Sequence, residues 1–127
     1  MSATVAVDFD GVIHAYSRGW QDGSIYDEPA PGAFAALREL MERYAVFVHT
    51  TRLPVAVARW IKARSGIETA WHEDESMLPE FWNERDTLLV TRRKLPAVAY
   101  IDDRGIRFES WDQALAELAR HERQART

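Results

Sequence analysis

Short, strongly apolar segments alternate with segments of helical periodicity along this chain. The apolar segments are rich in β-branched residues and are bounded by polar residues or glycine, which is typical of buried strands. Strands that alternate with helices predict parallel pairing through right-handed crossovers in a layered sheet. We therefore predict an α/β fold, a three-layer Rossmann-like sandwich with a mainly parallel central sheet. The predicted strands span residues 4–9, 45–49, 87–91 and 97–101.

Proline and capping residues predict where the helices begin and end. Pro31 and Pro54 can each open a helix, because the first turn does not need the N–H that proline lacks, and Gly66 is a natural end for the second helix. Ser110, with Gln113 three residues later, forms a capping box before the last helix. Residues 68–86 are harder to interpret, and we expect a short strand, an acidic loop and a turn of helix near residue 81.

The composition fits one folded domain covering residues 1–127, with 46% hydrophobic and 28% charged residues. Residues 12–31 contain glycines and prolines without a sustained period, so we expect a long loop or flap there. A formal charge of −4 argues against broad, sequence-independent binding of nucleic acid. The absence of cysteine excludes disulfides, thiolate metal sites and cysteine nucleophiles. Because no signal-peptide pattern or bilayer-spanning apolar run is seen, we expect a cytoplasmic protein with no membrane partner.

Acidic, hydroxyl and basic side chains follow the predicted strands. Ligands of parallel α/β sheets bind beyond the carboxyl ends of the strands, so we expect these side chains to share one crevice. Several carboxylates in one site need a counter-charge, and their oxygens suit Mg²⁺, which also bridges phosphate oxygens. A carboxylate can act as a nucleophile, a second can transfer protons, and a lysine or hydroxyl can hold phosphoryl oxygens. The residues are Asp8 and Asp10, then Thr50, then Lys94, and finally Asp102 and Asp103.

The same residues carry a resemblance to the haloacid dehalogenase (HAD) superfamily. Residues 5–12, Val-Ala-Val-Asp-Phe-Asp-Gly-Val, are similar to the first motif of HAD phosphatases. Residues 46–50 resemble the second motif, an apolar strand that ends in Thr or Ser. Lys94 matches the third motif, and residues 101–103, Ile-Asp-Asp, match the acidic fourth motif. All four motifs occur in the family's order and cover nearly the whole chain, so the resemblance implies a HAD-type fold.

The resemblance also implies a role for each matching residue. Asp8 would be the nucleophile and a metal ligand, and Asp10 the general acid/base, with its backbone carbonyl also on the metal. Thr50 and Lys94 would stabilise the phosphoryl group. Asp102 would bind Mg²⁺ directly, and Asp103 would assist directly or through water. An acid at position 10 is absent from the dehalogenase and P-type ATPase branches, so the implied activity is Mg²⁺-dependent phosphatase.

The sequence alone leaves several residue assignments open. Thr51 could replace Thr50, and Arg93 could assist or replace Lys94. His14 could touch substrate, although a surface or packing role is favoured, and Trp20 with Tyr16 could stack on a ring-bearing substrate or form a dimer contact. Arg52 and Arg104 could bind phosphate or pair with Asp103.

No segment is long enough for the cap domain that usually gives HAD enzymes their specificity, so the resemblance implies a small capless member. Capless members act on large substrates that cover the site, or they form homo-oligomers in which a neighbour supplies the lid. The expected substrate is a phosphorylated small molecule or a nucleic-acid end. The latter follows from residues 101–104, Ile-Asp-Asp-Arg, which resemble the 3′-phosphatase domain of phage-type polynucleotide kinases. The alternative from another class is a non-enzymatic HAD-like binding module.

Overall fold

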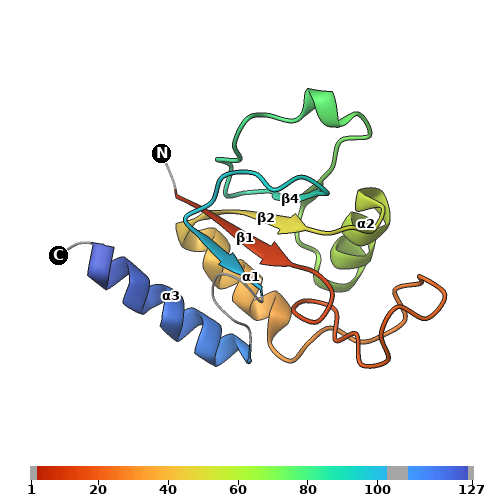
Figure 1. Cartoon of the computed structure of the whole chain (residues 1–127), viewed down its shortest axis with the longest axis horizontal. Coiled ribbons are helices and arrows are strands. Elements are labelled where there is room, and N and C mark those ends of the chain that lie inside the picture. The colour runs from red at the N-terminus through yellow and green to blue at the C-terminus, as the bar shows by residue number, and fades with distance from the viewer. Residues whose placement is uncertain (1–2, 103–108, 126–127) are drawn as a thin grey trace.

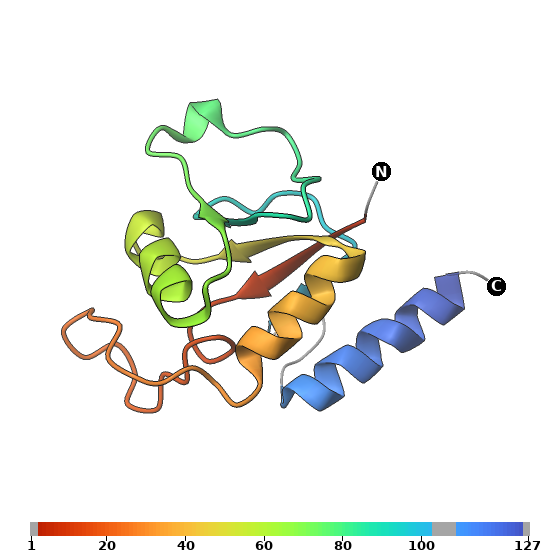
Figure 2. The ribbon, with the colours of Figure 1, turned by 180° about the vertical axis from the view of Figure 1, so that it is seen from behind.

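The computed structural model describes residues 3–102 and 109–125, and it is an α/β structure built on one five-stranded sheet. The strand order is β3-β4-β2-β1-β5, and every strand pair in this sheet is parallel. The strands are β1 Thr4–Asp8, β2 Ala45–His49, β3 Thr69–Ala70, β4 Leu88–Thr91 and β5 Ala99–Ile101. The helices are α1 Ala33–Arg43, α2 Pro54–Ser65 and α3 Trp111–Ala125, with a short 3₁₀ turn, η1, at Glu75–Met77 (Figures 1 and 2).

The direction in which each connection crosses the sheet explains which face it covers. The chain steps one way from β1 to β2 and on to β3, and it steps back from β3 to β4 and on to β5. Right-handed connections that run in opposite directions must lie on opposite faces of a sheet. Accordingly, α1 and α2 pack on the face that carries Val5 and Val7, whereas residues 78–82 and 95–97 supply side chains on the other face.

The sheet therefore separates two apolar clusters of unequal size. The larger cluster joins Val7 and Val48 to residues of all three described α-helices, for example Leu37, Ile61 and Leu118. The smaller cluster contains six buried side chains, which come from strands and from irregular segments. They are Ala6, Ala45, Phe47, Trp82, Leu89 and Leu95. The layer opposite the α-helices is thus mostly irregular chain and the η1 turn, in keeping with the loop and single helical turn expected after the second helix.

The predicted element boundaries agree closely with the structure in most places. Helix α2 begins at Pro54, and Gly66 ends it with a left-handed φ of 77°, a conformation that glycine adopts without strain. At the start of α3 the backbone N–H of Gln113 donates to Ser110 Oγ at 3.2 Å, and the Gln113 side chain accepts from the N–H of Glu109. Two details differ: the single helical turn lies at Glu75–Met77 and not near residue 81, and α1 begins at Ala33, after Gly32, and not at Pro31.

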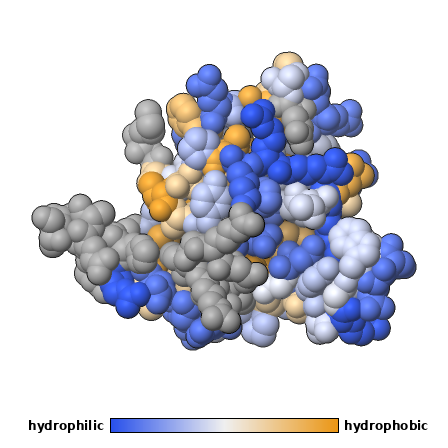
Figure 3. Space-filling view, viewed as in Figure 1, coloured by the Kyte–Doolittle hydropathy of each residue, from blue (hydrophilic) through white to orange (hydrophobic). Residues whose placement is uncertain are grey.

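The surface shows separate hydrophobic areas in place of one continuous patch on the face seen in Figure 3. Among the described residues, the large hydrophobic side chains that are exposed come from different parts of the chain, and they are Trp20, Leu53, Met77, Phe81 and Val98. Within the described ranges, no helix combines the length and the apolar character needed to cross a bilayer.

Candidate active site

The carboxyl ends of the central strands form an open cleft of about 300 Å³. Strand β1 lies between β2 and β5, so the residues that follow these three parallel strands meet at one edge of the sheet. This edge is where ligands bind in open α/β sheets. The cleft is lined by Asp8, Asp10, His49, Thr50, Thr51, Lys94 and Asp102. Five of the six predicted site residues therefore face the same cavity; the sixth, Asp103, lies outside the described residues.

Asp8 is the last residue of β1, and its carboxylate is half-buried at the base of the cleft. Oδ1 accepts the backbone N–H of Phe9 at 2.9 Å. Burial raises the pKa of the Asp8 carboxyl above its ordinary value of 3.8, and the charges of Asp102 and Asp10 act in the same direction, partly opposed by the Phe9 N–H and by His49. The ionised form of Asp8 is thus disfavoured mainly because burial removes part of its solvation.

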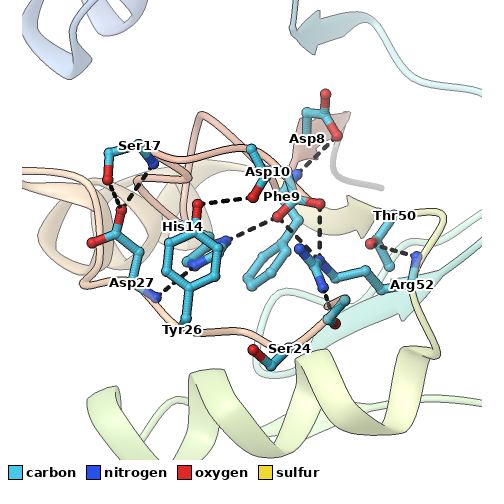
Figure 4. A network of polar contacts seen from close by, with 12 residues as sticks. Asp8, Phe9, Asp10, His14, Ser17, Ser24, Tyr26, Asp27, Thr50 and Arg52 are labelled. Atoms are coloured by element: carbon cyan, nitrogen blue, oxygen red, sulfur yellow. Dashed lines mark hydrogen bonds and ion pairs between the residues drawn. The ribbon is translucent and has the colours of Figure 1, made fainter. Parts of the chain in front are cut away.

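Asp10 points away from Asp8 and is held by two side chains, as Figure 4 shows. Arg52 Nε donates to both carboxylate oxygens, at 3.1 Å from Oδ1 and 2.9 Å from Oδ2. His14 Nδ1 lies 2.9 Å from Oδ1. The side chains of His14 and Arg52 are 0% and 3% exposed, whereas that of Asp10 is 20% exposed. Asp10 therefore sits at the border between a buried polar network and the open cleft.

A tight turn after β1 brings His14 back to Asp10. The N–H groups of Val12, Ile13 and His14 all point at the carbonyl of Phe9, at 3.2, 2.9 and 2.9 Å. Gly11 takes a φ of 83° at the start of this turn, which a residue with a side chain adopts only under strain. The turn places the two side chains of the i and i+4 pair, Asp10 and His14, against each other.

The flap, residues 12–31, is joined to the second strand end through Arg52. The guanidinium Nη1 donates to the carbonyl of Gly23 at 2.6 Å and its carbon lies 4.5 Å from the ring centroid of Trp20. Within the flap, Asp27 accepts the Ser17 hydroxyl and backbone N–H at 2.6 and 2.9 Å. These bonds lower the Asp27 pKa to about 2. The flap therefore has a definite fold that is fixed to the site.

The neutral and basic residues of the cleft differ in exposure. Thr50 is buried, and its Oγ accepts the backbone N–H of Arg52 at 3.0 Å, a short hydroxyl turn that still leaves the O–H free to donate. Thr51 also lines the cleft but is exposed and has no such support. Lys94 is exposed at the rim, with Nζ 6.0 Å from the centroid of the Tyr100 ring. Thr50 is therefore better placed than Thr51 to present a hydroxyl in a fixed position. Lys94 lines the cleft, and Arg93 does not.

The carboxylates of Asp8 and Asp102 are the part of the cleft that could hold a metal ion. They follow Val7 and Ile101, which are register partners on neighbouring strands. No group of three or more acidic or histidine side chains in the described parts of the chain is arranged to hold a metal ion, in keeping with the Asp10 carboxylate being turned to His14 and Arg52. Mg²⁺ commonly takes one or two carboxylates and keeps several waters, so this pair of carboxylate donors fits the ion.

Two functional residues differ from what the sequence indicated. His14 was favoured for a surface or packing role; it is buried and packed, but it also bonds to Asp10. The sequence left open whether Arg52 binds phosphate or pairs with Asp103, and in the structure it pairs with Asp10. The spacing of four residues between Asp10 and His14 was the sequence signal that could have indicated their contact. Nothing in the sequence links Arg52 to Asp10, because they are 42 positions apart. Arg104 lies outside the described residues.

Comparisons of this chain with protein-family models, with curated proteins and with solved structures find no match.

Proposed function

We propose that this chain is a Mg²⁺-dependent phosphatase of the HAD type, which hydrolyses a phosphomonoester through a phosphorylated Asp8. The observation that carries the proposal is the meeting of a nucleophile, an acid/base, a hydroxyl, a cation and a second carboxylate in one cleft. These residues are Asp8, Asp10, Thr50, Lys94 and Asp102. Asp8 and Asp10 lie in different environments, Asp8 beside Asp102 and Asp10 bonded to His14 and Arg52. A binding module would not need this difference between its two carboxylates.

The first half-reaction transfers the phosphoryl group to the protein. An oxygen of Asp8 attacks phosphorus, the bond from phosphorus to the ester oxygen breaks, and the electron pair leaves on that oxygen. Asp10 in its protonated form gives the departing oxygen its proton. Thr50 and Lys94 donate hydrogen bonds to the phosphoryl oxygens as charge shifts onto them. When bound by Asp8 and Asp102, Mg²⁺ supplies positive charge that offsets the carboxylates and polarises the phosphoryl group.

The second half-reaction restores the enzyme. Asp10, now ionised, accepts a proton from a water molecule whose oxygen attacks the phosphorus of the aspartyl-phosphate. The bond between phosphorus and Asp8 breaks, and inorganic phosphate is released with both carboxyl groups back in their starting states. The hydrogen bonds from His14 and Arg52 hold Asp10 in place through both proton transfers.

The substrate class follows from the openness of the cleft. The flap folds back on Arg52 and His14, and in the described chain no cap domain encloses the strand ends. We therefore expect one of two substrates. One is a phosphorylated small molecule, and the other is a nucleic-acid end whose own bulk covers the cleft.

Phosphate release with and without Mg²⁺ tests this proposal. The assay uses p-nitrophenyl phosphate, phosphorylated sugars and nucleotides, and a 3′-phosphorylated oligonucleotide beside its mononucleotide. We expect turnover of at least one substrate with Mg²⁺, reduced on the order of 10²-fold or more by EDTA and recovered by added Mg²⁺. Turnover that is unaffected by EDTA would contradict the metal requirement. A clear preference for the oligonucleotide over its mononucleotide would identify a strand end as the substrate.

A further inference from the structure

His14 is the most completely buried polar residue near the cleft, and its two ring nitrogens have different hydrogen-bond partners. Nε2 accepts the backbone N–H of Asp27 at 3.0 Å, so this nitrogen carries no hydrogen. The hydrogen of the neutral ring must then be on Nδ1, from which it is donated to Asp10 Oδ1 at 2.9 Å. A backbone amide of the flap thereby fixes the tautomer of the ring that contacts Asp10.

Aromatic side chains hold the His14 ring in this orientation. The ring stacks on Phe9, with centroids 5.4 Å apart and planes 16° apart, and meets the edges of Tyr26 and Trp60 at 5.3 and 5.7 Å. A ring packed on several sides cannot rotate to another hydrogen-bonding arrangement without moving its neighbours. The donor from Nδ1 is therefore directed at one position of Asp10.

Asp10 receives hydrogen bonds from two directions, and the two donors have different consequences. Arg52 contributes a charge and also ties down Gly23 and Trp20 of the flap. His14 contributes a neutral donor whose geometry depends on Asp27, at the far end of the flap. Together they restrict the Asp10 carboxylate to one rotamer at the cleft border, turned from Asp8 (Figure 4).

We infer that His14 is a positioning residue that aims Asp10 at the leaving group, and that the fold of the flap is coupled to proton transfer through the Asp27 N–H. The inference rests on the proposed phosphatase function. It goes beyond that function, because it makes flap residues far from the reacting atoms necessary for the step in which the ester oxygen departs. His14 itself touches neither substrate nor metal in this account.

The dependence of the rate on the leaving group separates positioning from general structural support. His14→Phe preserves the aromatic packing but removes both hydrogen bonds. Alkyl phosphates have a poor leaving group that needs a proton from Asp10, whereas p-nitrophenolate departs without one. We expect His14→Phe to lower kcat/KM for an alkyl phosphate by about 100-fold, and for p-nitrophenyl phosphate by about threefold or less. His14→Asn, whose amide nitrogen can take the place of Nδ1, should restore most of the loss.

The control is Leu118→Ala, which removes buried apolar contacts in α3, on a part of the core outside the cleft. It should lower the Tm of the protein and leave the ratio of the two kcat/KM values unchanged. An equal loss on both substrates in His14→Phe would overturn the inference and leave the proposed function standing. No wild-type turnover of any phosphomonoester would instead overturn the proposed function, and the kinetic consequence for His14 with it.

A measurement without turnover tests the geometry by itself. The ¹⁵N chemical shifts of the His14 ring report which nitrogen carries the hydrogen. We expect a protonated Nδ1 and an unprotonated Nε2 in the wild-type protein at neutral pH. Hydrogen on Nε2 would overturn the inference whatever the activity, because Nδ1 would then have nothing to donate to Asp10.

Discussion

Asp8→Asn is expected to reduce phosphomonoester turnover by at least about 10⁴-fold, the largest effect of any single substitution in the cleft. The amide has no negative charge, and its oxygen is a far weaker nucleophile than a carboxylate, so the first half-reaction stops. The packing should not change, because the Asn oxygen can still accept the N–H of Phe9 that Oδ1 accepts in the wild type. The measurement is kcat/KM with Mg²⁺, and activity unchanged in the variant would contradict Asp8 as the nucleophile.

The same substitution has the opposite effect on the stability of the metal-free protein. The pKa of Asp8 is raised in the folded state, chiefly by burial, so the folded protein holds the proton more tightly than the unfolded chain. The ionised carboxylate therefore costs stability above the folded pKa, and the cost disappears as the pH falls through that pKa to below the ordinary value of 3.8. Because the group is partly exposed, we expect Asp8→Asn to stabilise by only about 0.5–1 kcal/mol at pH 7.

Thermal unfolding at several pH values with and without Mg²⁺ checks this second effect. The difference between Asp8→Asn and the wild type should shrink as the pH is lowered toward 4. Added Mg²⁺ should raise the Tm of the wild type and raise that of the variant much less, since one of the two carboxylates is gone. A variant that is less stable than the wild type at pH 7 without metal would contradict the charge account of the cleft.

Arg52→Leu is expected to lower the free energy of unfolding by about 3 kcal/mol. The loss leaves the Asp10 carboxylate with His14 as its remaining side-chain donor in the described chain, and it releases the Gly23 carbonyl and the Trp20 ring of the flap. The measurement is denaturant unfolding of the two proteins. Much of the penalty comes from a carboxylate that has lost its counter-charge, so Asp10→Asn in the Arg52→Leu background should recover part of it.

Arg59→Leu is the matched control for this comparison. Arg59 lies on α2 and is exposed, so the same exchange should change stability by no more than about 0.5 kcal/mol. Equal effects of the two Arg→Leu substitutions would contradict the claim that the Asp10–Arg52 pair fixes the flap to the sheet.

The parts of this fold that depend on local chemistry could be predicted from the sequence. Runs of β-branched residues predicted the central strands, and the helix ends were predicted from Pro54, Gly66 and Ser110. These signals are local, because each residue acts through its own backbone or that of its near neighbours. The placement of the irregular segments over the second face could not be predicted. The face that they cover follows from the sheet order, in which two connections run backward, and that order depends on strand pairing between distant residues, which the local pattern of residues 71–98 does not specify.

The candidate site also has a part that the sequence predicts and a part that it does not. Strand-end motifs placed Asp8, Asp10, Thr50, Lys94 and Asp102 in one cleft, since parallel strands align their carboxyl ends whatever the details of packing. The network behind Asp10 depends on the path of the flap, which brings residues from opposite ends of a loop to one side chain. Pattern alone does not specify that path, because the flap has no sustained period and its bonds are individual side-chain contacts.

The central claim, a phosphoryl group carried on Asp8, is tested most directly by a burst experiment with Asp10→Asn. The p-nitrophenolate group leaves p-nitrophenyl phosphate without an acid, so Asp8 can still be phosphorylated, whereas water attack lacks its base and is slow. Rapid mixing should give a burst of p-nitrophenolate stoichiometric with the enzyme, and acid quenching followed by peptide mass spectrometry should find the phosphoryl group on Asp8. A wild-type enzyme that turns over, combined with a variant that shows no burst or carries the label on another residue, would contradict the account.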